Sequence, residues 1–249
     1  MQQPVILITG ASRGIGAATA LLAGEQGYAV CVNYVRNRDA ADAVVNAIIA
    51  KGGKAIAVAA DVAVEADVVK LFQTVDAKLG ALTALVNNAG ILETQMRLEH
   101  MDAARVQRIF MTNVIGSFIC AREAVKRMST ASGGKGGGIV NVSSVASRVG
   151  GSGEYVDYAS SKGAIDTMTI GLAKEVAHQG IRVNAVRPGV IYTEIHASGG
   201  EAGRVDRVKD GIPMRRGGRA DEVAQAIMWL LSEQASYSTG SFIDVSGGR

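Results

Sequence analysis

Short apolar runs rich in β-branched residues recur along this chain, and longer stretches with helical periodicity separate them. The runs predict strands at Val5–Thr9, Ala29–Tyr34, Ala55–Ala60, Ala84–Asn87, Ile139–Ser143, Arg182–Arg187 and Ser241–Val245. The stretches between them predict helices at Ile15–Gln26, Arg38–Ala50, Glu65–Leu79, Ala103–Met128, Tyr158–His178 and Ala220–Leu231. Near-continuous apolar strands that alternate with helices are typical of a parallel sheet covered on both faces. The sequence therefore predicts an α/β fold with a doubly wound, seven-stranded parallel sheet.

Nothing in the composition divides the chain. At 249 residues it could form one large domain or two small ones, but no composition break or internal repeat appears. We expect a single domain over residues 1–249. The segment from Val190 to Arg216 is long and rich in glycine and charge, so we expect a lid at about 190–216, a plain surface excursion being the alternative. Ser132–Gly138 lacks the Walker spacing and is expected to be a flexible connection.

Charge and hydropathy restrict the partners. The formal net charge is +3 and no block of Lys or Arg occurs, which argues against nucleic-acid binding. No apolar run approaches the length of a transmembrane helix, and the strand pattern begins at Val5, which leaves no room for a signal peptide. The histidines, His100, His178 and His196, lack metal-ligand spacing. We therefore expect a cytoplasmic protein with no membrane partner and no bound metal.

The segment Thr9–Gly16, with the sequence TGASRGIG, follows the first predicted strand and opens the first predicted helix. Glycines permit a tight turn and a close backbone approach, and a helix N-terminus offers free N–H groups and partial positive charge to a pyrophosphate. The spacing Gly-x-x-x-Gly-x-Gly at a strand–helix junction therefore predicts a dinucleotide site in a Rossmann-type fold.

The end of the second predicted strand discriminates between NAD and NADP. NAD sites carry Asp or Glu there for the ribose hydroxyls, but here the chain runs Asn-Tyr-Val-Arg-Asn-Arg with no acid before Asp39. A carboxylate would repel a 2′-phosphate, whereas Arg13 and Arg36 could bind it. We infer NADP(H). The alternative is that Arg36 and Arg38 are only the solvated start of the next helix.

Tyr158 and Lys162 stand four residues apart, so on a helix they share one face. A free tyrosine titrates near about pH 10 and is a poor acid or base at neutral pH, but a nearby ammonium favours tyrosinate. The pair could therefore serve in acid–base catalysis. The spacing alone also arises by chance on solvated helix faces, so its meaning depends on the other motifs.

Together these motifs resemble the compact type of the short-chain dehydrogenase/reductase family over essentially the whole chain. The matching segments are TGASRGIG at 9–16, Asp61-Val62, Asn87-Asn88-Ala89-Gly90, Asn113, NVSS at 141–144, YASSK at 158–162, Pro188-Gly189 with Thr193, and the closing segment 240–248. The short chain and the glycine spacing disfavour the extended, epimerase-type branch.

The resemblance implies roles for four catalytic residues. Tyr158 would be the acid/base, and Lys162 would lower its pKa and bind the nicotinamide ribose. Ser144 would hydrogen-bond the substrate oxygen, and Asn113 would hold a water that links Lys162 to solvent.

The resemblance also implies contacts with the cofactor. The adenine would meet Asp61 and Val62, the adenine-side ribose region Asn88 to Gly90, and the nicotinamide end Pro188 to Thr193. The full set of predicted cofactor residues is Gly10, Ser12, Arg13, Gly14, Ile15, Gly16, Asn33, Tyr34, Arg36, Asp61, Val62, Asn88, Ala89, Gly90, Tyr158, Lys162, Pro188, Gly189, Ile191 and Thr193.

Two features near the catalytic motif leave alternatives open. Ser143 is the other candidate serine, but adjacent residues at a strand end point to opposite faces, so only one can face the substrate. The stretch between Ser144 and Tyr158 is one residue longer than in many relatives, which affects the substrate rim. Tyr155 has no lysine four residues on, although it could line the pocket.

The expected activity is NADP(H)-dependent hydride transfer between the nicotinamide and a carbonyl or secondary alcohol, with reduction as the favoured direction. Alternatives are a 3-oxoacyl-carrier-protein reductase, a sugar or alcohol dehydrogenase, and a non-catalytic NADP-binding redox sensor. An acidic carrier protein would call for a basic surface, for which Arg204, Arg207, Lys209, Arg215 and Arg216 are the candidates. The family's usual assembly implies a homotetramer, built through the long helices at 103–128 and 158–178 and the C-terminal strand.

Overall fold

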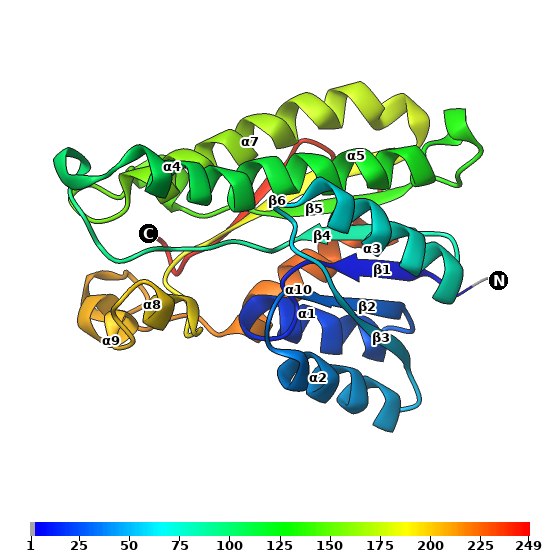
Figure 1. Ribbon diagram of the computed structural model, residues 1–249, viewed down its shortest axis with the longest axis horizontal. Coiled ribbons are helices and arrows are strands. Elements are labelled where there is room, and N and C mark those ends of the chain that lie inside the picture. Colours follow the sequence, from blue (N-terminus) through cyan, green and yellow to red (C-terminus); the bar gives the residue numbers. More distant parts are fainter. Residues whose placement is uncertain (1–2) are drawn as a thin grey trace.

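The computed structural model describes residues 3–249, so Met1 and Gln2 of the expected domain lie outside the described residues. Within residues 3–249, seven strands form one parallel sheet in the order β3-β2-β1-β4-β5-β6-β7 (Figure 1). The strands are β1 Val5–Ile8, β2 Ala29–Tyr34, β3 Lys54–Ala59, β4 Ala84–Asn87, β5 Gly137–Val142, β6 Ile181–Pro188 and β7 Phe242–Val245. The predicted seven-stranded, doubly wound parallel sheet is confirmed.

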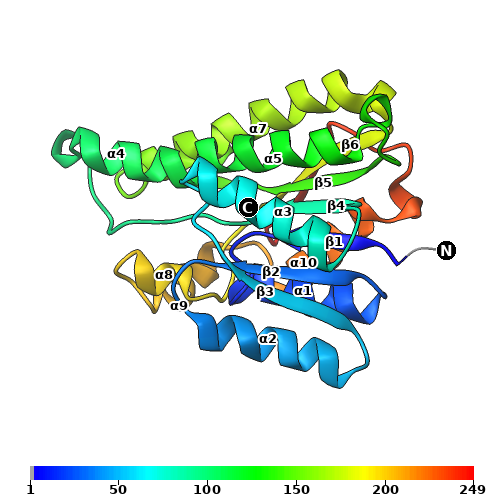
Figure 2. The same cartoon turned by 45° about the vertical axis from the view of Figure 1, so that its right-hand side comes forward.

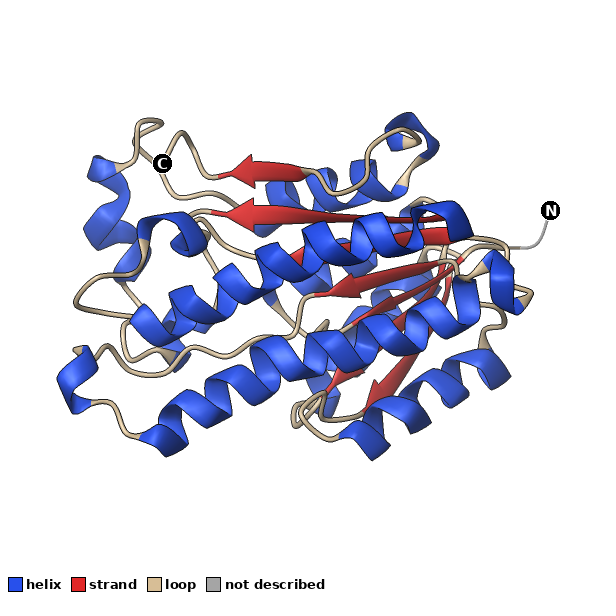
Figure 3. Cartoon of the chain, turned by 90° about the horizontal axis from the view of Figure 1, so that it is seen from above, coloured by secondary structure: helices blue, strands red, loops and turns tan. Residues whose placement is uncertain are grey.

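Helices cover both faces of the sheet (Figures 1 and 3). One layer holds α1 (Gly14–Glu25), α2 (Arg38–Ala50) and α10 (Ala220–Leu231); the other holds α3 (Glu65–Lys78), α4 (Ala103–Phe110), α5 (Gly116–Met128) and α7 (Val156–Val176). Because side chains alternate along a strand, Ile6 and Ile8 of β1 enter the first core and Val5 and Leu7 enter the second. Burial on both faces explains why these strands are almost continuously apolar.

The predicted helix at 103–128 is not one regular helix. A π-helical turn, η2 (Met111–Ile115), separates α4 from α5. The side chain of Asn113 in this turn exchanges hydrogen bonds with the backbone of Ile91, at 2.8 Å from the Ile91 nitrogen and 3.1 Å to its carbonyl oxygen. π-turns within α-helices are frequent at functional sites. Here the turn coincides with a residue that the sequence singles out.

Short elements lie at both edges of the sheet. Those that follow the carboxyl ends of strands are η1 (Leu98–His100), α6 (Ala146–Val149), α8 (Ile195–Ser198), α9 (Arg204–Val208) and η5 (Lys209–Gly211). The 3₁₀ turns η3 (Thr130–Ser132), η4 (Ala177–Gln179) and η6 (Glu233–Ala235) precede β5, β6 and β7. In Figures 1 and 2, α8 and α9 lie at the end of the molecule opposite the N-terminus. The strands run toward this same end, where α8 and α9 lie. The strand order reverses between β1 and β4, which places a binding crevice outside their carboxyl ends.

Candidate active site

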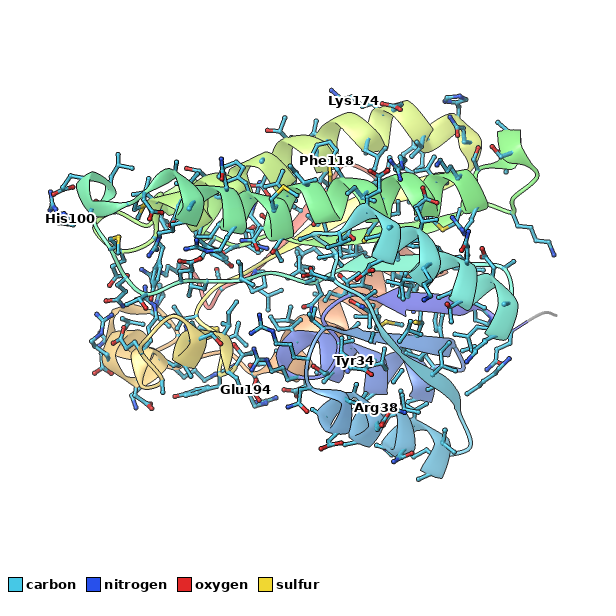
Figure 4. The ribbon with its side chains drawn as sticks, viewed as in Figure 1. Tyr34, Arg38, His100, Phe118, Lys174 and Glu194 are labelled. Atoms are coloured by element: carbon cyan, nitrogen blue, oxygen red, sulfur yellow. The ribbon has the colours of Figure 1, made fainter. Side chains whose placement is uncertain are left out.

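A cavity of about 1390 Å³ lies at this edge of the sheet. Ser144, Tyr158, Lys162 and every predicted cofactor residue except Gly16 line it. Residues of the 190–216 segment line it as well. Of the labelled side chains in Figure 4, Tyr34 at the end of β2 and Glu194 just before α8 belong to its wall, whereas His100 lies at the far tip beside α4. Side chains from distant parts of the sequence therefore meet in one site.

Asn33, at the end of β2, supports the glycine turn from beneath. Its buried side chain accepts a hydrogen bond from the Gly10 nitrogen at 3.1 Å and donates to the carbonyl oxygens of Val58 and Ala60 at 3.3 and 2.9 Å. An additional bond joins the Ala11 nitrogen to the Asn33 carbonyl oxygen at 2.8 Å. The hydrogen bonds of this side chain thus hold the turn against β2 and β3.

Asn88, after β4, supports the same turn from the other side. Its Nδ2 donates to the carbonyl oxygens of Thr9 and Gly10 at 2.8 and 3.0 Å. A Cβ on Gly16 would lie 2.5 Å from that Nδ2 and 2.6 Å from the Gly10 carbonyl oxygen. Gly16 does not line the cavity, so it serves the turn through close packing. Gly10 adopts a positive φ of 60°, which favours glycine because it lacks a Cβ.

The arginines near the end of β2 differ in their surroundings. Arg38 pairs with Asp42 one turn along α2, with Nε 3.3 Å from Oδ2, as expected for a solvated helix start. Arg36 and Arg13 are exposed and line the cavity, and within residues 3–249 neither has an ion-pair partner. The N-terminus of α1 and these two free cations make this end of the cavity suited to an anion.

Tyr158 lies near the start of α7, beside Ser144 at the end of β5. Burial raises the pKa of Tyr158 to about 12, and a hydrogen bond with Ser144 opposes that rise. The hydroxyl of Ser144 also accepts a hydrogen bond from the Ala146 nitrogen at 3.1 Å. Tyr158 is therefore protonated at neutral pH in this structure.

Lys162 is buried one turn further along α7. Its Nζ donates to the Val142 carbonyl oxygen at 2.7 Å and lies 5.6 Å from the centre of the Tyr158 ring. Burial lowers the pKa of Lys162 to about 8, against the opposing effect of Asp166. Desolvation of the phenol dominates the pKa of Tyr158 in this structure, and the Lys162 ammonium binds a carbonyl of β5. The expectation that Lys162 lowers the pKa of Tyr158 stays a prediction.

Asn113 does not line the cavity and is connected to the site through hydrogen bonds to α7. Its Nδ2 donates to Ser161 Oγ at 3.1 Å, and that hydroxyl donates to the Tyr158 carbonyl oxygen at 2.7 Å. A Cβ on Gly90 would lie 3.4 Å from Asn113 Oδ1 and 3.7 Å from Lys162 Nζ. Asn113 is thus near Lys162 and ties η2 to α7, while its role in holding a water stays a prediction.

The two adjacent serines have different partners, as their positions at a strand end suggest. Ser143 Oγ donates to Asp166 Oδ1 on α7 at 2.6 Å and lies 3.2 Å from the Lys162 carbonyl oxygen. Ser144 instead meets Tyr158. This arrangement favours Ser144 as the serine that faces a substrate.

Arg204 and Arg207, which the sequence suggests as part of a basic surface, instead form ion pairs that the sequence did not predict. Arg204 Nη2 lies 2.5 Å from Glu154 Oε2, and Arg207 Nη2 lies 3.2 Å from Glu154 Oε1. Arg207 also binds Glu201, which accepts from Gln95 Nε2 at 2.5 Å. These pairs tie the 190–216 segment to the loops after β4 and before α7. They join residues up to 106 positions apart, so no local sequence pattern announces them.

Tyr155 packs beneath this network. The Arg204 guanidinium lies 4.9 Å from the centre of the Tyr155 ring, within the range of a cation–π contact. Tyr155 is buried and lines the cavity, as the sequence suggested it could.

Three further features concern the described residues outside the cavity. Cys31 and Cys120 are buried free thiols. Within residues 3–249 no group of three or more metal-ligating side chains gathers. Across the same residues, no helix combines the length and the apolar character that a bilayer crossing requires.

Comparison with known proteins places this site in a family. Residues 10–249 match the family model described as Enoyl-(Acyl carrier protein) reductase. The chain is 63% identical over 245 residues to the uncharacterized oxidoreductase YgfF of Escherichia coli, covering 98% of this chain and 99% of that protein. It is 40% identical over 245 residues to a 3-oxoacyl-[acyl-carrier-protein] reductase of Synechocystis, covering 98% and 96%. A crystal structure of a short-chain type dehydrogenase/reductase from Mycobacterium marinum superposes with a TM-score of 0.93 at 35% identity, over 99% of this chain and 95% of that one. The chain therefore belongs to the short-chain dehydrogenase/reductase family of oxidoreductases.

Proposed function

We propose that the protein reduces a carbonyl to a secondary alcohol with NADPH, in a reversible reaction. The observation that carries this proposal is the convergence of Ser144, Tyr158 and Lys162 at one end of the cavity. The nicotinamide, when bound, supplies the hydride. The chain's own residues then deal with the negative charge that grows on the substrate oxygen.

Tyr158 donates a proton to that oxygen, and Ser144 orients the oxygen by hydrogen bonding. A tyrosine whose pKa is about 12 is protonated at neutral pH, which suits an acid in the reducing direction. The ammonium of Lys162 stabilises the tyrosinate that remains. Asn113 fixes the part of α7 that carries Tyr158 and Lys162, because it hydrogen-bonds Ser161 and Ser161 hydrogen-bonds the Tyr158 carbonyl oxygen.

The preference for NADP(H) rests on charge. Arg13 and Arg36 line the cavity, and no carboxylate precedes Asp39 after β2. Two arginines with no acidic partner among residues 3–249 suit a 2′-phosphate, whereas the ribose hydroxyls of NAD call for an acid.

The substrate is proposed to be a small molecule rather than an acyl-carrier protein, although relatives at 36–40% identity carry that name. An acidic carrier would need free cations beside the pocket. Most candidates for such a surface are paired within the chain: Arg204 with Glu154, Arg207 with Glu154 and Glu201, Lys209 with Asp206, and Arg216 with Glu222. A sugar or alcohol dehydrogenase remains the alternative reading of the same site.

We also propose a cytoplasmic homotetramer. Phe118 of α5 and Ile170 of α7 are 51% and 42% exposed on the outer helical layer, where Figure 4 labels Phe118. Apolar side chains of that size suit contact with a second copy.

The proposal is tested with a panel of ketones, diketones, hydroxyketones and the matching alcohols, monitored by NADPH absorbance. Turnover of a carbonyl with NADPH, at a kcat/KM at least about tenfold above that with NADH, supports it. No turnover anywhere in the panel, with NADPH bound at full stoichiometry, would favour a redox sensor. A clear preference for NADH would contradict the assigned cofactor.

A further inference from the structure

Ser143 has a partner that the catalytic roles do not explain. Its hydroxyl donates to Asp166 Oδ1 at 2.6 Å, and Arg187 of β6 donates from Nε to Asp166 Oδ2 at 3.0 Å. Both oxygens of the carboxylate are therefore engaged, and the Asp166 side chain is only 13% exposed. Such a carboxylate is fixed in orientation.

Asp166 lies on the same face of α7 as Lys162. The two residues are four apart, so their side chains occupy adjacent turns of the helix. Ser143 contacts both turns, because its hydroxyl is also 3.2 Å from the Lys162 carbonyl oxygen. Ser143, Asp166 and Arg187 thus form a polar group beside Lys162, and Ser143 connects it to the cavity wall.

Lys162 carries a charge in surroundings that disfavour it. Its residue is 4% exposed, and the Nζ contact is to the neutral carbonyl of Val142. Among residues 3–249, the charged and titratable groups that face it are Tyr158 and Asp166 of α7. Arg187 lies behind Asp166 and also pairs with Asp244 of β7, at 3.6 Å. A buried ammonium needs a compensating negative charge.

We propose that Asp166 is a positioning residue that keeps Lys162 charged, with Ser143 orienting its carboxylate and Arg187 sharing its negative charge. Its catalytic meaning rests on the proposed function, since a charged Lys162 is what stabilises tyrosinate. The hydrogen bond to Asp166 gives the first serine of the NVSS motif a role distinct from that of Ser144.

The test is a titration of Lys162 by NMR in protein labelled with ¹³Cε-lysine, with its signal assigned by its loss in Lys162→Met. In the wild type we expect Lys162 to titrate near pH 8. Asp166→Asn should lower that midpoint by about one pH unit, because an opposite charge is removed. Arg187→Met should raise it, because the carboxylate then acts on Lys162 alone. Ser143→Ala should lower it by less than Asp166→Asn.

Glu175→Gln is the matched control, because it removes an exposed carboxylate from the same helix 13 residues further on, about 20 Å away. It should leave the midpoint unchanged. An unchanged midpoint in Asp166→Asn, or shifts of the same sign in Asp166→Asn and Arg187→Met, would overturn the proposal, since a purely structural disturbance has no reason to change sign with charge. If Asp166→Asn does not fold, Arg187→Met and Ser143→Ala decide the matter.

The titration needs neither substrate nor turnover. An inactive wild-type protein would therefore contradict the proposed function. The titration midpoint of Lys162 would still test the effect of Asp166 on its charge. In an active protein, Asp166→Asn should lower kcat at least about fivefold at pH 8, with the KM for NADPH changing less than kcat.

Discussion

The two ends of the cavity are held together by different interactions. At the cofactor end, neutral hydrogen bonds from the side chains of Asn33 and Asn88 fix the glycine turn from below and from the side. At the substrate end, ion pairs of Arg204 and Arg207 with Glu154 and Glu201 tie the 190–216 segment to the opposite wall.

The difference matters because the two kinds of contact respond differently to change. Buried hydrogen bonds with both partners engaged are costly to break, at about 1–3 kcal/mol for each group left unpaired. The side chains of these ion pairs are partly exposed, from 12% for Arg204 to 50% for Arg207, and ion pairs that solvent reaches are weakened by salt. The cofactor end should therefore behave as a fixed frame, whereas the substrate end can open and close again with small changes in free energy.

Among the variants that compare the two ends of the cavity, Arg36→Asp has the largest expected effect, and it tests cofactor binding at the cofactor end. Arg36→Asp should weaken NADPH binding by about 100-fold, because a charge-assisted contact worth about 1.5–3 kcal/mol is replaced by repulsion. Fluorescence titration with NADPH and NADH measures it. Arg38→Asp is the matched control, since Arg38 already pairs with Asp42 and should leave NADPH affinity within about threefold of the wild type. Equal losses in both variants would mean that Arg36 makes no specific phosphate contact.

A smaller effect, on stability, is expected when a glycine at the cofactor end or in the 190–216 segment is replaced by alanine. Gly16→Ala places a Cβ against Asn88 Nδ2 and the Gly10 carbonyl oxygen, so it should lower the free energy of unfolding by about 1–3 kcal/mol and weaken NADPH binding. Gly211→Ala, in the 190–216 segment, meets nothing within 4 Å and should change stability by less than about 0.5 kcal/mol. Chemical denaturation measures the free energy of unfolding of both variants. A similar loss of stability in both would contradict the proposed difference between the two ends.

The smallest effect is expected at the ion pairs. Arg204→Met removes the contacts with Glu154 and the Tyr155 ring, and should raise the KM for the carbonyl substrate about fivefold or less, with little change in melting temperature. Arg219→Met, whose exposed partner is Asp221 in the same turn, serves as the control and should leave KM unchanged. A KM for Arg204→Met equal to that of the wild type would show that these pairs do not shape the substrate end.

The same contrast explains what the sequence could and could not predict. The bounds of β2, β4, α2 and α10 match the predictions. Strands buried on both faces and helices with one buried face each have a regular pattern of apolar residues in the sequence. The glycine turn is equally readable, since its geometry needs glycine at fixed positions. These features are local or nearly so.

The remaining features depend on contacts that sequence spacing does not encode. The π-turn at Asn113 accompanies pairing with the Ile91 backbone, and the ion pairs join loops far apart in the chain. The raised pKa of Tyr158 depends on how far the folded chain removes the phenol from water, which the spacing to Lys162 does not encode. Short helices such as α8 and α9 form in their tertiary setting rather than from their own propensity.

The central claim is that Tyr158 gives the proton that completes hydride transfer, and Tyr158→Phe tests it most directly. This variant keeps the ring and loses only the hydroxyl. With the best carbonyl from the panel, turnover of NADPH should fall at least about 1000-fold, within the range of general acid catalysis. The dissociation constant for NADPH, measured by fluorescence on the same preparation, should stay within about threefold of the wild type. Turnover within tenfold of the wild type would contradict the account.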